Sequence, residues 1–282
     1  MTDRSMPLTG ETSPPPSTDA RNEPRLRMRG ISKSFGAVRA LNNVDFEVYA
    51  GQVVGLVGDN GAGKSTLIKA ISGVGPCDEG EIFVEGQPVK ITNPQIATRM
   101  GIETVYQDLS LCDNLDVVSN LFLGRELHSP FGTLNEVEME RRGLAVLRTL
   151  DVKLPSVRAV VATLSGGQRQ SIAVAKTILR NAKVVLLDEP TAALGVAQTR
   201  QVLQLIHRLR DQGLAVVVIS HNLADVFEVV DQVFVLRLGK MVARFDIQST
   251  TPEQIVAAIT GAEFGSILQT NQANGNDVAG GK

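Results

Sequence analysis

The chain has 282 residues, 43% of them hydrophobic, which is enough to bury one large α/β core or two small ones. Its 28 basic and 30 acidic residues give a net charge of -2, which excludes bulk electrostatic attraction to nucleic acid or anionic lipid. Two cysteines, Cys77 and Cys112, lack metal-ligand spacing and are typical of reduced cytosolic thiols. The apolar runs are far shorter than the ~20 residues that a membrane-spanning helix needs, so we expect a globular protein without one.

Both ends of the chain have the composition of disordered tails. Residues 1–24 are rich in Pro, Ser and Thr and lack the apolar stretch of a secretory signal. Residues 265–282 are dominated by Asn, Gln and Gly. We therefore expect the folded domain to cover residues 25–264.

The first half of this domain predicts strands followed by a glycine-rich loop and a helix. Strand-like patterns cover Leu26 to Ser32 and Val44 to Tyr49, and Val53 to Val57 is a buried-strand candidate. After the glycine-rich stretch, a helix that stops at Gly73 is predicted from three apolar residues on one face, namely Leu67, Ile68 and Ile71.

Residues 109–183 change character and predict a helical subdomain. The charged segment from Glu136 to Leu150 has leucines at three-residue spacing, and β-branched runs are scarce. Beyond it an α/β rhythm returns, with strands at 184–187 and 215–219, a helix at 196–210, and a final helix with one apolar face made by Leu223, Val226, Phe227 and Val230. This alternation predicts parallel strands covered by helices.

The nine residues directly after the strand predicted at 53–57 contain the eight-residue phosphate-loop pattern G-x-x-x-x-G-K-[ST]. They are Gly58, Asp59, Asn60, Gly61, Ala62, Gly63, Lys64, Ser65 and Thr66. Glycines allow backbone N–H groups to surround an anion, and the start of the following helix adds partial positive charge. A glycine turn that only joins a strand to a helix is the alternative, but it leaves unexplained why Lys64 can reach the outer phosphates and Ser65 can ligate Mg²⁺.

Two acids, Asp188 and Glu189, end the apolar strand predicted at 184–187. Burying adjacent carboxylates is costly, and α/β sheets bind ligands at the carboxyl ends of their strands. We expect Asp188 to hold Mg²⁺, directly or through water, and Glu189 to polarise a water for attack on the γ-phosphorus. Two solvated acids at a strand end are the alternative. With the phosphate loop, this pair predicts a nucleotide hydrolase of unspecified kind.

A third motif narrows the class of hydrolase. Leu164, Ser165, Gly166, Gly167 and Gln168, followed by an apolar helix, closely resemble the signature element of ABC ATPases. The exposed N–H groups and hydroxyl of such a loop can bind a second anion, although Ser165 read alone can be an ordinary helix N-cap. The resemblance implies that the signature of one subunit faces the phosphate loop of another, so that ATP lies between two cassettes.

The resemblance extends over about residues 26–262 and implies a fold class. The implied fold is an α/β P-loop NTPase core of the RecA-like type, with an N-terminal antiparallel β subdomain and a helical insert. Phe35 matches the position that stacks on adenine, and His221 matches the switch histidine that touches the γ-phosphate. Gln107 matches a glutamine that contacts Mg²⁺ or water and joins the core to the insert. The ordinary alternatives are a surface or core Phe, a solvated Gln and a structural His.

Gly195 departs from the family pattern. Many members have Ser-Ala-Leu-Asp after the Glu-Pro-Thr element, whereas this chain has Ala192, Ala193, Leu194 and Gly195. The acidic group that helps couple two subunits is missing, so coupling across the pair is expected to be altered. Because Glu189 and His221 are both present, we do not expect a degenerate site.

Finer details resemble the ATP-binding subunits of monosaccharide importers of the ribose, xylose and fructose type. The stretches that carry this resemblance are residues 58–73, 105–111, 120–126 and 191–195. It implies a homodimer of cassettes at the cytoplasmic face of the cell membrane, with membrane permease subunits as partners and an extracytoplasmic solute-binding protein as an indirect one. No nucleic-acid partner is expected.

Three other functions use similar motifs. An exporter ATPase has the same nucleotide elements but different membrane domains. An ABC protein that acts on DNA or ribosomes is expected to have two cassettes, a long coiled insert or a basic surface, and none is evident here. A nucleotide-binding regulator would bind ATP without Mg²⁺-dependent release of phosphate.

Overall fold

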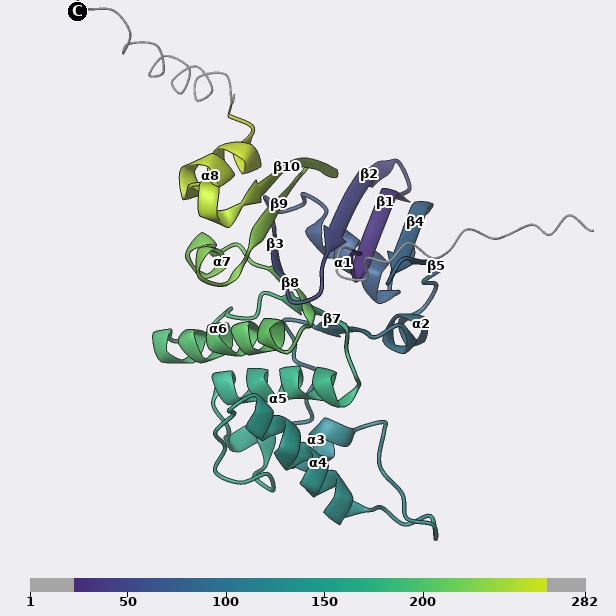
Figure 1. Ribbon diagram of the computed structural model, residues 1–282, viewed down its shortest axis with the longest axis vertical. Coiled ribbons are helices and arrows are strands. Elements are labelled where there is room, and N and C mark those ends of the chain that lie inside the picture. The colour runs from purple at the N-terminus through teal and green to yellow at the C-terminus, as the bar shows by residue number, and fades with distance from the viewer. Residues whose placement is uncertain (1–22, 263–282) are drawn as a thin grey trace, which may run out of the picture.

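The computed structural model describes residues 23–262, so the predicted tails lie outside the described residues except at their inner edge. A six-stranded sheet with the order β10-β9-β3-β8-β7-β6 forms the centre (Figure 1). Its strands are β3 (Val53–Val57), β6 (Ile102–Val105), β7 (Val184–Asp188), β8 (Ala215–Ile219), β9 (Gln232–Arg237) and β10 (Lys240–Asp246). All neighbouring pairs are parallel except β9 and β10.

The central strands are apolar throughout because both faces of the sheet are covered. Along β7, Val184 and Leu186 point into one hydrophobic core, and Val185 and Leu187 point into the other. This alternation is the two-residue period of a strand. A continuous apolar run in the sequence therefore supplies both cores at once.

A second, four-stranded antiparallel sheet covers one face, with the order β2-β1-β4-β5. Its strands are β1 (Leu26–Phe35), β2 (Val38–Val48), β4 (Glu79–Val84) and β5 (Gln87–Val89), and the core beneath it includes helices α1 (Lys64–Ser72) and α2 (Pro94–Arg99). The rings of Phe46 on β2 and Phe234 on β9 join the two sheets, with centroids 4.9 Å apart. An aromatic pair of this kind adds to the free energy gained by burial.

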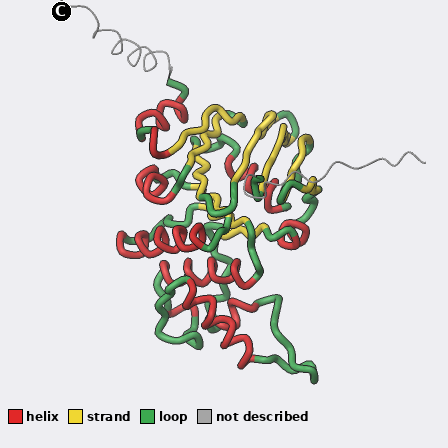
Figure 2. Tube along the Cα trace, in the orientation of Figure 1, coloured by secondary structure: helices red, strands yellow, loops and turns green. Residues whose placement is uncertain are grey.

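Helices cover the opposite face and extend beyond it. They are α5 (Gly166–Leu179), α6 (Val196–Asp211), α7 (Leu223–Val229) and α8 (Pro252–Thr260), together with α3 (Val117–Phe122), α4 (Glu136–Thr149) and the short 3₁₀ turns Val161–Thr163 and Ile247–Ser249. Figure 2 shows that strands occupy the upper part and that the lower end holds only helices and loops. Helix α5 joins these parts because it contacts α6 and β6 on one side and α3 and α4 on the other. Within residues 23–262, no helix has the length and apolar character needed to cross a bilayer.

The structure confirms the predicted α/β fold with a P-loop core, and the strands at 53–57 and 215–219 have the predicted bounds. The expected bounds of the first two strands were wrong, because β1 runs on to Phe35 and β2 begins at Val38. Three register shifts between Met28 and Ser34 interrupt the apolar alternation that marks a strand in the sequence. Long-range pairing extends these strands through residues whose local pattern does not predict a strand.

Two valines provide a matched test of this core. Val185 is fully buried, whereas Val137 on α4 is 81% exposed. We expect Val185→Ala to lower the free energy of unfolding by about 2 kcal/mol, through lost burial and an unfilled cavity. Val137→Ala should change it by less than about 0.5 kcal/mol. Urea unfolding followed by circular dichroism measures both values, and equal losses would contradict the assignment of Val185 to the core.

Candidate functional site

The phosphate-loop residues connect β3 to α1. Lys64 is the first residue of the helix, and Gly63 at the N-cap has no side chain to accept the free N–H groups of the first turn. These donors and the helix dipole suit an anion at this end. The Lys64 ammonium donates to the carbonyl oxygens of Gly58 (2.6 Å) and Asp59 (3.0 Å), which hold it over the loop. Ser65 is exposed beside it.

Two of the loop glycines are required by close packing. A Cβ atom at Gly58 would lie 2.1 Å from the carbonyl oxygen of Leu236, and one at Gly63 would lie 2.7 Å from that of Ala40. The turn between β9 and β10 also holds the loop, because Gly239 N–H donates to the Ala62 carbonyl at 2.9 Å. The sequence reasoning missed this support, since Gly239 between two apolar runs indicates only a turn.

The two predicted acids lie at the carboxyl end of β7, next to β8. The Glu189 N–H donates to the Ile219 carbonyl at 2.9 Å, and Glu189 has a left-handed backbone with φ of 50°. This conformation is sparsely populated for a non-glycine residue, and such strain clusters at functional sites. The Glu189 Oε2 lies 2.9 Å from Nδ1 of His221, whose side chain is 75% exposed. The structure therefore brings the predicted acid and the predicted switch histidine into contact.

The charges of Lys64, Asp188 and Glu189 act on one another at this edge of the sheet. Burial and the neighbouring Glu189 raise the pKa of Asp188, although Lys64 and Lys69 oppose the shift. Burial lowers the pKa of Lys64, although Glu189, Asp59 and Asp188 oppose that shift. Two carboxylates thus lie near one partly desolvated ammonium. The negative charge exceeds the positive charge, so this edge of the sheet favours an additional cation.

Gln107 and Phe35 lie on the surface near the ends of other elements. Gln107 is exposed just after β6, the strand that pairs with β7. Phe35 is 56% exposed at the end of β1, with the Lys33 ammonium 5.6 Å from the centre of its ring. Phe35 is therefore a surface residue and not part of the core, which leaves its ring available for stacking on a planar group.

The signature-like residues form the start of α5. The Ser165 hydroxyl accepts from the Gln168 N–H at 3.3 Å, and the Gln168 side chain accepts from the Ser165 N–H at 3.0 Å. Ser165 therefore makes the helix N-cap that was the alternative reading, in the form of a capping box. The same geometry leaves other N–H groups of this first turn without a side-chain partner.

The signature residues pack against the segment that follows Glu189. Positions that a Cβ would occupy on Gly166 and Gly167 lie 2.7 Å from Leu194 and 3.2 Å from Gln198. In the described part of the chain, no hydrogen bond or ion pair joins residues 165–168 to the phosphate loop. The structure therefore does not bring these two predicted anion-binding loops of one chain together.

Gly195 is the N-cap of α6, with φ of -75°, and a Cβ placed there would meet nothing within 4 Å. The local structure thus has space for the aspartate that many family members carry. The missing acid is a property of this sequence and not a consequence of crowding. Gly195 has no side chain to cap α6, and its own N–H donates to the Gln198 Oε1 at 3.4 Å.

The family model "ABC transporter" matches residues 41–192, which include the phosphate loop, the signature-like loop and both acids. The chain belongs to the ABC transporter ATP-binding family. It is a nucleotide-binding ABC ATPase cassette. The matched range includes Lys64 and Glu189, and His221 lies outside it.

Curated relatives with sugar-import names resemble the cassette over most of its length. The fructose import ATP-binding protein FrcA of Rhizobium meliloti is 46% identical over 86% of this chain and 95% of that protein. The xylose/arabinose import ATP-binding protein XylG of Sulfolobus acidocaldarius is 43% identical over 86% and 96%. The ribose import ATP-binding protein RbsA of Caldanaerobacter subterraneus subsp. tengcongensis is 39% identical, and the chain spans 49% of its length.

Solved cassettes share the fold. The ADP conformation of MJ1267, an ATP-binding cassette of an ABC transporter, is 25% identical with a TM-score of 0.73, and the match covers 87% of this chain and 98% of that one. A nucleotide-free cassette from an ABC transporter, 24% identical over the same shares, has a TM-score of 0.72. The dimeric structure of the cassette MJ0796 is 23% identical over 80% of this chain and all of that one, with a TM-score of 0.67.

The loop packing can be tested with two glycines. Gly58→Ala should displace the phosphate loop because its Cβ would overlap the Leu236 carbonyl, whereas a Cβ at Gly61 meets nothing within 4 Å. We expect Gly58→Ala to abolish the rise in melting temperature that ATP causes. Gly61→Ala should retain that rise and cost about 1 kcal/mol through its left-handed backbone. Thermal unfolding with and without ATP measures this, and an unchanged ATP response of Gly58→Ala would contradict the packing argument.

Proposed function

We propose that two copies of this cassette hydrolyse ATP at composite sites and thereby energise uptake of a monosaccharide through separate membrane permease subunits. The observation that carries the proposal is the convergence of Lys64, Asp188, Glu189 and His221 at one edge of the parallel sheet. The import names of the fructose, xylose and ribose relatives support the choice of solute class.

The residues at this edge fit a magnesium ion. The Asp188 carboxylate, the Ser65 hydroxyl and the Gln107 amide supply hard oxygen donors, which Mg²⁺ prefers together with phosphate oxygens. Burial, and then the neighbouring Glu189, raise the pKa of Asp188, and an added cation would favour its charged form. When bound, Mg²⁺ would neutralise charge on the β- and γ-phosphates.

The remaining residues divide the chemistry of hydrolysis among them. The phosphate loop and Lys64 bind the phosphates, and Phe35 stacks on adenine. Glu189 accepts the proton of the attacking water, which needs a carboxylate held in position at the γ-phosphate. His221, 2.9 Å from Glu189, orients that carboxylate and contacts the γ-phosphate.

The phosphate loop and the signature-like loop lie apart in one chain. A second cassette is therefore needed to bring a signature-like loop to each phosphate loop. Within residues 23–262, Ser165, Gly166, Gly167 and Gln168 make no bond to the phosphate loop. The N–H groups of Gly166 and Gly167, which the capping box leaves without a partner, suit the γ-phosphate of a partner's ATP. A homodimer with two-fold symmetry then completes two identical sites. A dimeric cassette among the structures with the same fold supports this geometry.

Closure of the pair on ATP and its reopening after hydrolysis would drive the permease. We infer that the surface around Gln107 and the helical subdomain, at residues 109–183, transmits this motion to the permease. The cassette would then lie at the cytoplasmic face of the membrane, and an extracytoplasmic solute-binding protein would deliver the sugar to the permease. The sugar would not contact this chain.

Because Glu189 acts as the base, replacing it should slow ATP hydrolysis without weakening ATP binding. Glu189→Gln keeps the shape and the contact to His221 but removes the base, so ATP affinity should persist while kcat falls by at least about 100-fold. Phosphate release and ATP binding measure the two quantities. Glu228→Gln, at an exposed position on α7, is the matched control and should retain full turnover. Hydrolysis retained by Glu189→Gln would remove this residue from the base role.

The transport role predicts a membrane partner and a solute response. We expect affinity purification of the full chain from its native membrane to recover a permease. In proteoliposomes with that permease and its solute-binding protein, fructose, ribose or xylose should stimulate ATP hydrolysis. The Glu189→Gln cassette in the same assembly is the control for uncoupled activity. Recovery of an exporter permease, or of no membrane protein, would contradict import.

A further inference from the structure

Residues 156–163, which we call the strap, lead into the signature-like loop. The strap runs alongside the segment that follows Gln107. Backbone N–H groups of Val117 and Val118 donate to strap carbonyls at 3.1 and 3.2 Å, and the strap's Val161 and Ala162 N–H groups donate to the carbonyls of Leu115 and Asp113 at 3.0 Å. Main-chain hydrogen bonds thus join the segment that leads to the signature-like loop to the segment that leads to α3.

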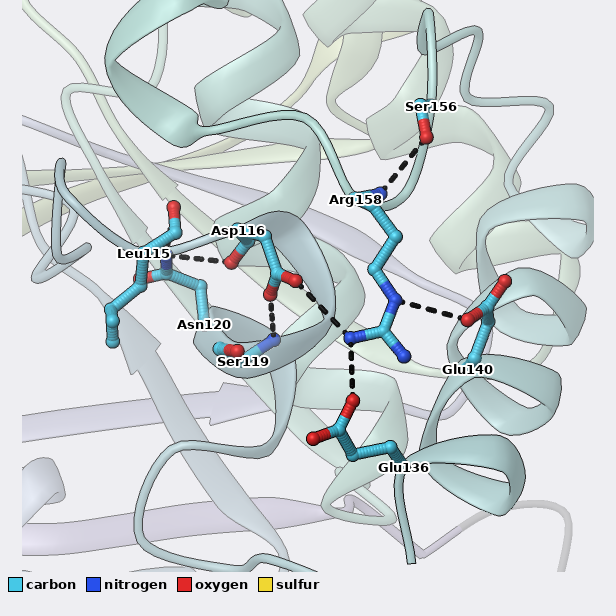
Figure 3. A network of polar contacts seen from close by, with 8 residues as sticks. All are labelled: Leu115, Asp116, Ser119, Asn120, Glu136, Glu140, Ser156 and Arg158. Carbon is cyan, nitrogen blue, oxygen red and sulfur yellow. Dashed lines mark hydrogen bonds and ion pairs between the residues drawn. The ribbon is translucent and has the colours of Figure 1, made fainter.

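Arg158 lies in the middle of the strap and is the centre of an ionic network (Figure 3). Its guanidinium contacts the Asp116 carboxylate at 3.3 Å, Glu136 at 3.1 Å and Glu140 at 3.0 Å. Asp116 is the N-cap of α3 and accepts from the Ser119 N–H at 2.7 Å. Glu136 and Glu140 are on α4. One guanidinium therefore connects the strap to two helices.

The network is stronger than a single surface ion pair. An exposed pair contributes little, but several carboxylates around one planar guanidinium form a network whose removal leaves like charges together. Although partial burial favours the neutral acid, hydrogen bonds from Ser119 and Arg158 hold the pKa of Asp116 below its usual value. Replacing Arg158 removes the one cation that these three acidic side chains share.

The strap continues directly into the first turn of α5. Arg169, in that turn, donates to the Ala162 carbonyl at 3.1 Å and contacts the Asp113 carboxylate at 3.2 Å. Ser165 lies two residues beyond the end of the strap. The position of the signature relative to α3 and α4 therefore depends on how firmly the strap is attached to these helices.

We propose that Arg158 is a positioning residue that holds the strap against α3 and α4, so that the signature loop moves with these helices as one body. This proposal rests on the proposed composite site, in which the signature of one copy completes the nucleotide site of the other. Arg158 acts on the partner's site and leaves the phosphate loop of its own chain unaffected. Its loss must therefore weaken pairing without weakening nucleotide binding by a single cassette.

The test compares two equilibria in the Glu189→Gln background, which keeps ATP intact. Sedimentation measures the dissociation constant of the ATP-bound pair, and calorimetry with ADP measures binding to the single cassette. We expect Arg158→Ala to weaken pairing roughly five- to tenfold and to change ADP affinity by less than about twofold. Glu140→Gln, which leaves Arg158 two partners, should give a smaller loss of pairing, and Arg158→Lys should restore part of it because the charge returns without the fork geometry.

Arg142→Ala is the matched control, because among residues 23–262 Arg142 pairs only with Glu138, on its own helix. It should pair as tightly as the parent. Pairing of Arg158→Ala at the parental strength would overturn the proposal. So would an equal fall of pairing, ADP affinity and melting temperature, since that pattern marks a merely structural residue. If the parent itself fails to pair with ATP, the composite site has failed and this inference fails with it.

Discussion

The parallel pairing of three strands is the constraint on which the site depends. Strand β8 lies between β3 and β7, and all three run in the same direction. Their carboxyl ends therefore meet at one edge, which is where open α/β sheets bind ligands. Lys64 follows β3, Asp188 ends β7 with Glu189 directly after it, and His221 follows β8, so residues more than 120 positions apart act on one another.

The fold shapes this edge by close contact as much as by charge. The end of β9 and the start of β2 leave no space for a Cβ atom at Gly58 or Gly63, so the loop is confined to one path. Glu189 adopts a left-handed backbone directly after β7, whose first four residues are buried. The surrounding packing stabilises this strained conformation, which directs the carboxylate toward His221.

Helix α5 has two functions in the architecture. Most of its length is buried between α6 and the helices α3 and α4, which fixes it in the core. Its first turn carries the signature-like loop, attached through the strap and Arg169 to the segment that follows Gln107. Within residues 23–262 this turn makes no bond to the phosphate loop of its own chain, and the proposed pairing of two cassettes depends on that separation.

The sequence by itself determined the local elements of this protein. The strands at 53–57 and 215–219, the helix that stops at Gly73 and the phosphate loop depend on short apolar runs, glycines and helix caps, all of which act between near neighbours. Only the tertiary structure decided the strand order, the extension of β1 to Phe35, the support of the loop by Gly239 and the network around Arg158. These features join residues that are distant in the chain, and their contact free energies exist only after the sheets and helices have packed.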